Sequence, residues 1–244
     1  MSRYARTHTV RISGNAPSGR ALRAALGDFS GHINWGYTKA TDGFNSAESI
    51  RLASNKRKAL RKMFADGVPT PEIFTPREAH HKVDDDTPLV GRTSYHTKNS
   101  GFWYCETVVD VERAIRSGAT HFMPFVENAR EFRVHVVNGY SIKISEKHKR
   151  YNPETGEFEE GSWTYPRKFK RKISLRRVAK QAMDSLELDF GAVDILYKKI
   201  GDVPTFFVLE VNCCPCLTDG SSDTLERYTR AFQEAQDEIN NSSI

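Results

Sequence analysis

Three oxygen-bearing side chains stand near the carboxyl-terminal end of the sequence, inside two consecutive apolar segments. Asp194 lies in FGAVDIL, whereas Glu210 and Asn212 lie two residues apart in FFVLEVN. On a strand, residues two apart point to the same face, so Glu210 and Asn212 are expected to project together. Burying carboxylates among such neighbours is costly unless a cation neutralises them. Hard oxygen ligands suit Mg²⁺, which commonly bridges substrate phosphates. Ion pairs with nearby arginines explain the same pattern equally well.

Positive charge is concentrated in two clusters, although the net charge of the chain is only +5. One cluster is KHKR at 147–150, and the other runs from Arg167 to Arg177. Such clusters indicate either a solvated face or a site for polyphosphate, an acidic substrate or nucleic acid. Trp163 and Tyr165 lie between the two clusters. They are expected either to anchor a lid or to stack against the bases of single-stranded nucleic acid.

The four cysteines are Cys105, Cys213, Cys214 and Cys216, and three of them fall in one short segment. A structural zinc site needs a second ligand pair with recognisable spacing, which the sequence does not contain. We therefore expect reduced loop thiols, with a zinc site as the alternative.

The bulk composition predicts a globular protein with a real core. The 244 residues are 38% hydrophobic and 11% aromatic, which suits one large domain or two small ones. The mean hydropathy is −0.58, and no stretch approaches the apolar length of a membrane span. The first fourteen residues lack the apolar run of a secretory signal, so the expected location is the cytoplasm.

Hydrophobic periodicity and turn residues predict the secondary structure. Helices are expected at 18–27 with Ser18 as N-cap, at 55–66, at 111–118 with Asp110 as cap, at 175–187 with Ser174 as cap, and at 221–241. Strands are expected at 8–12, 31–36, 88–92, 103–108, 121–126, 190–199 and 205–212, with a hairpin over 131–145 that turns at Asn138-Gly139. Residues 146–170 read as a polar, basic excursion with a PETGE turn. Helices lying between antiparallel hairpins predict the α+β class with antiparallel sheets.

The segments LDFGAVDI and FFVLEVNCCP resemble the closing signature of ATP-grasp enzymes, the superfamily of D-alanine–D-alanine ligase and the ribosomal-protein glutamate ligases. The resemblance implies that Asp194, Glu210 and Asn212 hold two Mg²⁺ ions that bridge the phosphates of ATP. Residues 45–71 resemble the stretch that opens the ATP-binding region, and the whole resemblance extends over residues 45–235.

The same resemblance implies roles for other side chains. Those expected to hold ATP are Lys56 and Arg92 at the phosphates, His96, Ser100 and Gly101 in the covering loop, the backbones of Met123 and Phe125 at the adenine, and Glu127 at the ribose. Arg133 is expected to point toward an acyl phosphate, and a core ion pair with Glu131 or Asp194 is the alternative. Lys143 and Lys147 are candidates for the γ-phosphate or the acceptor, although solvated charge is the default for Lys147. The alternative for His96 is an ordinary surface position, which is more common for a histidine in a polar loop.

Three positions depart from the family's pattern. Arg92 stands where the family has a lysine, Pro124 where it has the ribose acid, and Cys216 where a glycine usually follows Pro215. Arginine keeps its charge and binds phosphate in bidentate fashion, so the phosphate contact is expected to survive the first change.

These observations together predict an ATP-grasp fold in which two α+β subdomains grip ATP after a truncated amino-terminal unit. The expected boundaries are 1–50, 51–126 and 127–244, with the basic excursion at 146–172. The predicted activity is ATP-dependent joining of a carboxylate to an amine through an acyl phosphate, with ATP and Mg²⁺ as cofactors. One of these substrates is expected to be anionic, for example an acidic peptide or a macromolecule, and no membrane is involved. The alternatives are a kinase of the same fold and a nucleic-acid-binding protein with a decayed ATP site.

Overall fold

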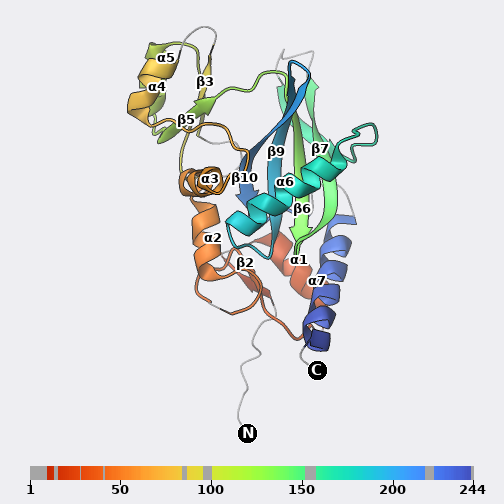
Figure 1. The fold of residues 1–244 in the computed structure, drawn as a ribbon. Helices are drawn as coiled ribbons and strands as arrows, with labels where there is room; N and C mark the ends of the chain where they lie inside the picture. Colours follow the sequence, from red (N-terminus) through yellow and green to blue (C-terminus); the bar gives the residue numbers. More distant parts are fainter. Residues whose placement is uncertain are drawn as a thin grey trace.

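The computed structural model describes residues 10–13, 16–27, 29–40, 42–83, 87–95, 101–151, 158–217 and 223–242. In this part of the chain the strands form a five-stranded sheet in the order β10-β9-β6-β7-β8, a three-stranded sheet in the order β4-β3-β5, and a parallel pair β1-β2 (Figure 1). Every pairing within the two larger sheets is antiparallel. The predicted α+β class with antiparallel sheets is therefore confirmed.

The five-stranded sheet is the centre of the molecule. Its strands are β6 (Arg130–Val137), β7 (Tyr140–Tyr151), β8 (Phe158–Thr164), β9 (Phe190–Ile200) and β10 (Val203–Asn212). Helix α6 (Lys172–Ser185) crosses one face of this sheet (Figure 1). Apolar side chains of that face and of α6 form the largest core, together with residues of α2 (Ala47–Ser54) and α3 (Lys56–Ala65).

The three-stranded sheet consists of β3 (Leu89–Arg92), β4 (Phe102–Cys105) and β5 (His121–Pro124). Helices α4 (Pro76–Lys82) and α5 (Val108–Arg116) pack against it and enclose a separate small core around Phe122. In Figure 1 this unit lies at the upper left, apart from the larger sheet.

A third core joins the two ends of the described chain. It packs β1 (Val10–Ile12), α1 (Pro17–Leu26) and β2 (Ile33–Trp35) against α7 (Asp223–Ser242) and the lower end of the five-stranded sheet. Asn45, at φ 60°, ties this unit to the sheet because its side-chain amide bonds the backbones of Asp189 and Phe190. The domain boundaries expected from the sequence stay a prediction.

Most predicted elements are present, but three predicted helix caps are wrong. Helix α1 begins at Pro17, and the Ser18 hydroxyl instead accepts a hydrogen bond from the amide of Leu217 at 3.0 Å. The cap of α5 is Thr107, which forms a capping box with Asp110 at the third helical position. Helix α6 begins at Lys172, so Ser174 lies inside its first turn. The hairpin is confirmed, because Asn138 and Gly139 both have positive φ at the β6–β7 turn.

Three further features differ from the prediction. Helices α2 and α4 were not predicted, because α2 is short and α4 buries only one side chain, Ala79. The Thr75–Glu78 capping box was the signal that could have located α4. The basic excursion is largely sheet, since β7 continues to Tyr151 and β8 returns from Phe158. The PETGE turn lies outside the described residues.

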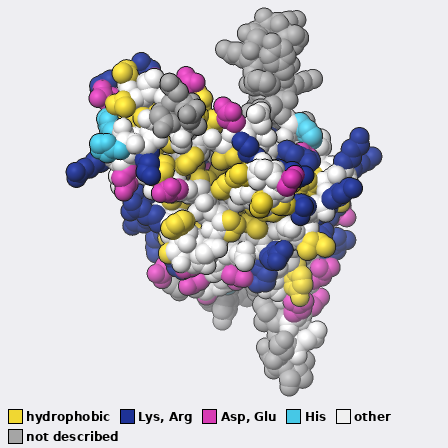
Figure 2. Space-filling model, turned by 45° about the horizontal axis from the view of Figure 1, so that its top comes forward, with side chains coloured by type: hydrophobic (Ala, Val, Ile, Leu, Met, Phe, Trp, Pro, Cys, Tyr) yellow, Lys and Arg dark blue, Asp and Glu magenta, His cyan; other side chains and the backbone are white. Residues whose placement is uncertain are grey.

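Figure 2 shows one face of the molecule, on which hydrophobic side chains gather across the middle while Lys and Arg side chains lie on both flanks, mixed with acidic ones. On this face the positive charge therefore does not form one continuous basic strip. None of the described helices is long and apolar enough to cross a membrane.

Candidate active site

One face of the five-stranded sheet, opposite to the face covered by α6, carries Arg133, Lys143, Lys147, Asp194 and Glu210. We call it the charged face. The register places Glu210, Asp194 and Arg133 side by side on β10, β9 and β6. The next row on the same face joins Glu131 of β6 to Lys147 of β7 and Trp163 of β8. Alternation along each strand sends the intervening apolar residues toward α6.

A bulge in β10 aligns Glu210 with Asp194. The register shifts between Val208, which pairs with Ile195, and Glu210, which pairs with Asp194, so Leu209 is the extra residue. Without this shift Leu209 would lie opposite Asp194. Bulges commonly re-aim side chains near functional sites, and this one places Glu210 and Asn212 on the charged face.

Arg133 and Asp194 form a bidentate ion pair at the centre of this face. The Nε and Nη2 atoms of Arg133 donate to the two carboxylate oxygens of Asp194 at 2.7 and 2.8 Å. Burial raises the pKa of Asp194 and the charge of Glu210 adds to this, while Arg133 acts in the opposite direction. Burial opposes the charge of Arg133, but the carboxylates of Asp194, Glu210 and Glu131 outweigh it and raise its pKa.

Lys56 connects the start of α3 to the acid on β10. Its Nζ donates to Oε2 of Glu210, and its backbone amide donates to the carbonyl of Ser94, in the segment after β3, at 3.0 Å. Asn55 caps the helix by accepting from the amide of Lys58. The helix start therefore holds the lysine between the three-stranded sheet and the charged face.

Glu131, Lys147 and Trp163 form the second part of the charged face. Lys147 Nζ donates to Glu131 at 3.1 Å, and burial raises the pKa of Glu131 although Lys147 partly offsets this. The ring of Trp163 lies 4.5 Å from the guanidinium of Arg133 and 5.6 Å from Lys147 Nζ. These distances suit cation–π contacts, so Trp163 holds both cations on this face.

Arg92 is the last residue of β3 and is a further cation influenced by the acids of the charged face. Burial lowers its pKa, and the carboxylates of Glu210 and Glu131 partly restore it. Its guanidinium also lies 5.6 Å from the ring centre of Phe102. Because the charges of Glu210 and Glu131 act on Arg92, the end of β3 lies within electrostatic range of the charged face.

The described residues contain no group of three His, Cys, Asp or Glu side chains that could hold a metal. The candidate metal ligands are the carboxylates of Asp194 and Glu210, with the amide of Asn212 as a third oxygen donor. Asn212 Oδ1 accepts from the amide of Cys214 at 2.9 Å, and the acids are neutralised by Arg133 and Lys56. The ion-pair interpretation is supported because these pairs are present. The Mg²⁺ interpretation stays a prediction, for which the anionic oxygen ligands are of a suitable type.

Lys143 lies on the same face but its contacts are with α7. Its Nζ donates to the hydroxyl of Thr224 and lies 3.2 Å from the carboxylate of Asp223. The neighbouring His135 is fully buried, and its Nδ1 bonds the hydroxyl of Tyr228 at 3.1 Å. Burial, with the charges of Arg133 and Lys143, lowers the pKa of His135 to about 3.

The residues expected around adenine and ribose lie on and beyond β5. Met123 pairs with Val90 of β3, and the amide of Phe125 donates to the carbonyl of Pro88 at 2.8 Å. The Phe125 ring packs edge-on against Tyr104 at 5.0 Å. Glu127 is exposed, and its charge contributes to the raised pKa of Tyr104, after burial and Glu106.

The covering loop is described only at its end. Gly101 has φ +68°, and a Cβ there would lie 2.7 Å from Thr93 Oγ1, so another residue would be both strained and crowded. His96 and Ser100 lie outside the described residues. The four cysteines are free thiols, and burial raises the pKa of Cys213 and Cys214.

The sequence interpretation named Glu131 only as an alternative ion-pair partner of Arg133, and it assigned no role to Asp223 and Tyr228. Glu131 was detectable, because it lies two residues before Arg133 on the same strand and so shares its face. Asp223 and Tyr228 gave no such signal, since they contact Lys143 and His135 across eighty or more residues of chain.

Comparison with solved structures identifies the fold. D-alanine–D-alanine ligase from Bacillus anthracis superposes with a TM-score of 0.58 at 14% identity, over 80% of this chain and 72% of the ligase. Biotin carboxylase from Campylobacter jejuni gives 0.61 at 18% identity, over 78% and 48% of the two chains. The ATP-grasp ligase PsnB in complex with a minimal precursor gives 0.60 at 17% identity, over 79% and 63%.

No protein-family model matches the sequence, and no curated protein matches it. The chain nevertheless has the ATP-grasp fold, as its resemblance to that superfamily implied. It spans about half to three quarters of the length of these solved structures.

Proposed function

We propose that this protein is an ATP-dependent ligase that joins a carboxylate to an amine. The observation that carries the proposal is the charged face itself. In an ATP-grasp fold, Asp194 and Glu210 lie in register on β9 and β10, and the amide of Asn212 lies two residues further along the same face. Arg133 of β6 and Lys56 of α3 pair with these acids, and Arg92 of β3 lies within the electrostatic influence of Glu210. Such a cluster supplies both oxygen ligands for Mg²⁺ and positive charge for phosphates.

The ion pairs are compatible with this role because they can exchange partners. Mg²⁺ held by Asp194, Glu210 and Asn212 would neutralise phosphate oxygens, the chemistry it supplies in phosphoryl transfer. Lys56 and Arg133 would then be released from the acids to contact ATP and the acyl phosphate. PsnB has been solved with Mg and ADP, which supports the use of both by a protein of this fold.

The reaction that suits these residues has two steps. A substrate carboxylate oxygen attacks the γ-phosphorus, the bond to the bridging oxygen breaks, and ADP leaves with an acyl phosphate remaining. The amine then forms the C–N bond as the C–O bond breaks, and phosphate and a proton are released. Arg133, Arg92 and Lys56 stabilise negative charge in the first step, and Trp163 holds Arg133 from one side.

Hydroxylamine trapping tests this proposal without knowledge of the natural amine. The protein is incubated with ATP, Mg²⁺, hydroxylamine and pools of amino acids and acidic peptides, and hydroxamate and ADP are measured. The proposal expects equal amounts of both, and loss of both in the Glu210→Gln variant. A stable phosphate ester in place of hydroxamate would indicate a kinase. No ADP from any pool, together with salt-sensitive oligonucleotide binding, would favour the nucleic-acid alternative.

A further inference from the structure

The outer edge of β7 between Ser141 and Ser145 has no strand beside it among the described residues. Strand β8 pairs with β7 only from Glu146 onward, because Glu146 lies opposite Thr164, the last residue of β8. On the other side β7 continues to pair with β6 as far as the Asn138-Gly139 turn. An uncovered edge presents backbone donors and acceptors to which another strand can add.

A cavity of about 640 Å³ runs along this edge. All five consecutive residues from Ser141 to Ser145 line it. Since successive side chains of a strand alternate between faces, only a cavity beside the edge touches all of them. Its other walls are Trp163, Thr164 and Tyr165, Arg176 of α6, and Asp223 and Arg227 of α7. The volume falls within the range of about 300–1,000 Å³ that ligand sites usually have.

The charges in this cavity favour an anionic ligand. Lys143, Arg176 and Arg227 are its cations, and Asp223 is its one acid. Asp223 is already bonded to Lys143 and Arg227, at 3.2 and 2.7 Å. Arg176 is exposed and has no ion-pair partner among the described residues. Arg227 also donates to the carbonyl of Ile142 at 2.9 Å, so one backbone group of the edge already accepts a hydrogen bond from a side chain.

The cavity and the charged face share walls. Ser145 lies opposite Arg133 in the sheet, and Trp163, which lines the cavity, covers Arg133 and Lys147. A chain lying along the edge would therefore end beside the residues proposed to contact the acyl phosphate.

We propose that this cavity binds an extended peptide carrying acidic side chains, which adds as a strand to the edge of β7 and is one substrate of the ligase. This assignment of substrate class rests on the proposed function, although binding itself does not need ATP. The backbone edge without a neighbouring strand favours a peptide over an oligonucleotide, which has no complementary backbone pattern. Asp223 also disfavours a ligand with a phosphate at every unit.

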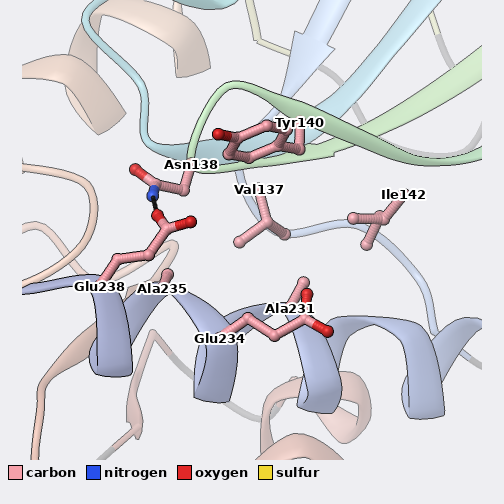
Figure 3. Close-up of a pocket in the computed structure, with 8 residues that line it drawn as sticks. All are labelled: Val137, Asn138, Tyr140, Ile142, Ala231, Glu234, Ala235 and Glu238. Carbon is pink, nitrogen blue, oxygen red and sulfur yellow. Dashed lines mark hydrogen bonds between the residues drawn. The ribbon is translucent and has the colours of Figure 1, made fainter.

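The smaller cavity provides an internal comparison. It has a volume of about 270 Å³ and lies between the β6–β7 turn and α7, where the side chain of Asn138 donates to Glu238 at 3.0 Å (Figure 3). Glu234 and Glu238 line it and no cation does, so an acidic peptide is not expected there. Glu234→Gln is therefore a control that should leave peptide binding unchanged.

Fluorescence anisotropy with the complete chain tests the charge requirement. The probe is a fluorescein-labelled decapeptide of alternating threonine and glutamate, compared with the same peptide carrying glutamine or lysine in place of glutamate. We expect the glutamate peptide to bind about ten-fold more tightly than the glutamine peptide, and the lysine peptide not to bind. Arg176→Gln should lower affinity for the glutamate peptide about ten-fold, whereas Arg177→Gln, on the same helix but outside the cavity, should not.

The backbone requirement is tested with the same peptide methylated at every second amide nitrogen, in the two alternating phases. Strand addition uses only alternate amides, so methylation in one phase should abolish binding and methylation in the other should not. The assignment would be overturned if the two methylated peptides bound equally, or if the Arg176 and Arg177 variants had equal effects. It would also be overturned if an oligothymidylate bound more tightly than the glutamate peptide. Hydroxamate formation from free amino acids without peptide binding would overturn it while leaving the ligase proposal intact. Peptide binding without ADP formation would support the binding site, but it would contradict the ligase proposal and with it the role of the peptide as a substrate.

Discussion

The two faces of the five-stranded sheet are built from the same strands but depend on different physics. On the face toward α6, Phe132, Val134, Val193 and Ile195 are fully buried in one apolar core. On the opposite face, their immediate neighbours Arg133 and Asp194 form an ion pair in which Asp194 is buried and Arg133 is partly buried. The face toward α6 stabilises the folded state by removing apolar area from water. The opposite face contains charges whose burial is costly unless each has a partner of opposite charge. The comparison predicts that substitutions on the apolar face lower stability with little effect on activity. Substitutions on the charged face should lower activity, and they should lower stability only where a buried charge is left without its partner.

The largest effect on the charged face is expected from removing one member of the central ion pair. Arg133→Met leaves Asp194 buried without its partner and should lower the free energy of unfolding by about 3–5 kcal/mol. The double variant Arg133→Met, Asp194→Leu should recover most of this loss while remaining inactive, which urea denaturation and the ADP assay would show. A double variant no more stable than the single one would mean that the pair itself stabilises the fold.

Neutralising the more exposed acid should separate activity from stability. Glu210→Gln keeps the shape of a side chain that is 22% exposed, so the free energy of unfolding should change by about 1 kcal/mol or less. Loss of a proposed Mg²⁺ ligand should lower ADP formation about 10²–10³-fold. Parallel denaturation and steady-state measurements would check this, and an active variant would remove Glu210 from the proposed site.

The apolar face should behave in the opposite way. Ile195→Ala should lower the free energy of unfolding by about 3 kcal/mol, because it opens a cavity beneath α6. ADP formation per folded molecule should stay within about two-fold of the parent, since the side chain contacts no proposed ligand. Leu196→Ala, one residue along on the other face and only half-buried, is the matched control and should cost less.

The sequence was sufficient for features that depend on local pattern. The Asn138-Gly139 turn, the helix expected at 55–66 and the pair of apolar strands around Asp194 and Glu210 each follow from near neighbours. The bulge at Leu209 does not, because β10 alone gives no sign that its register changes against β9. The contacts of Lys143 with α7 were also hidden, since they join residues eighty positions apart. Prediction thus found the acids, and the tertiary structure decided which cations neutralise them.

Stability should also depend on pH through His135. Its pKa is about 3 in the folded chain and about 6.5 when unfolded, so the unfolded chain binds the proton first as pH falls. Stability is complete above pH 6.5 and should decline between pH 6.5 and 3, by at most about 1.4 kcal/mol per pH unit. His135→Gln should flatten this decline relative to the parent in urea denaturation at pH 7, 6 and 5. Identical slopes for both proteins would exclude His135 as the source.

The measurement that bears most directly on the account is calorimetric titration with ATP, with and without Mg²⁺. It is performed on the parent and on the Glu210→Gln, Asn212→Ala variant, with circular dichroism to confirm that both are folded. The account predicts ATP binding that strengthens with Mg²⁺ in the parent and loses this Mg²⁺ dependence in the variant. The assignment of the charged face as an ATP site would be contradicted if the folded parent bound no ATP. It would also be contradicted if the parent and the variant bound ATP equally well in the presence of Mg²⁺.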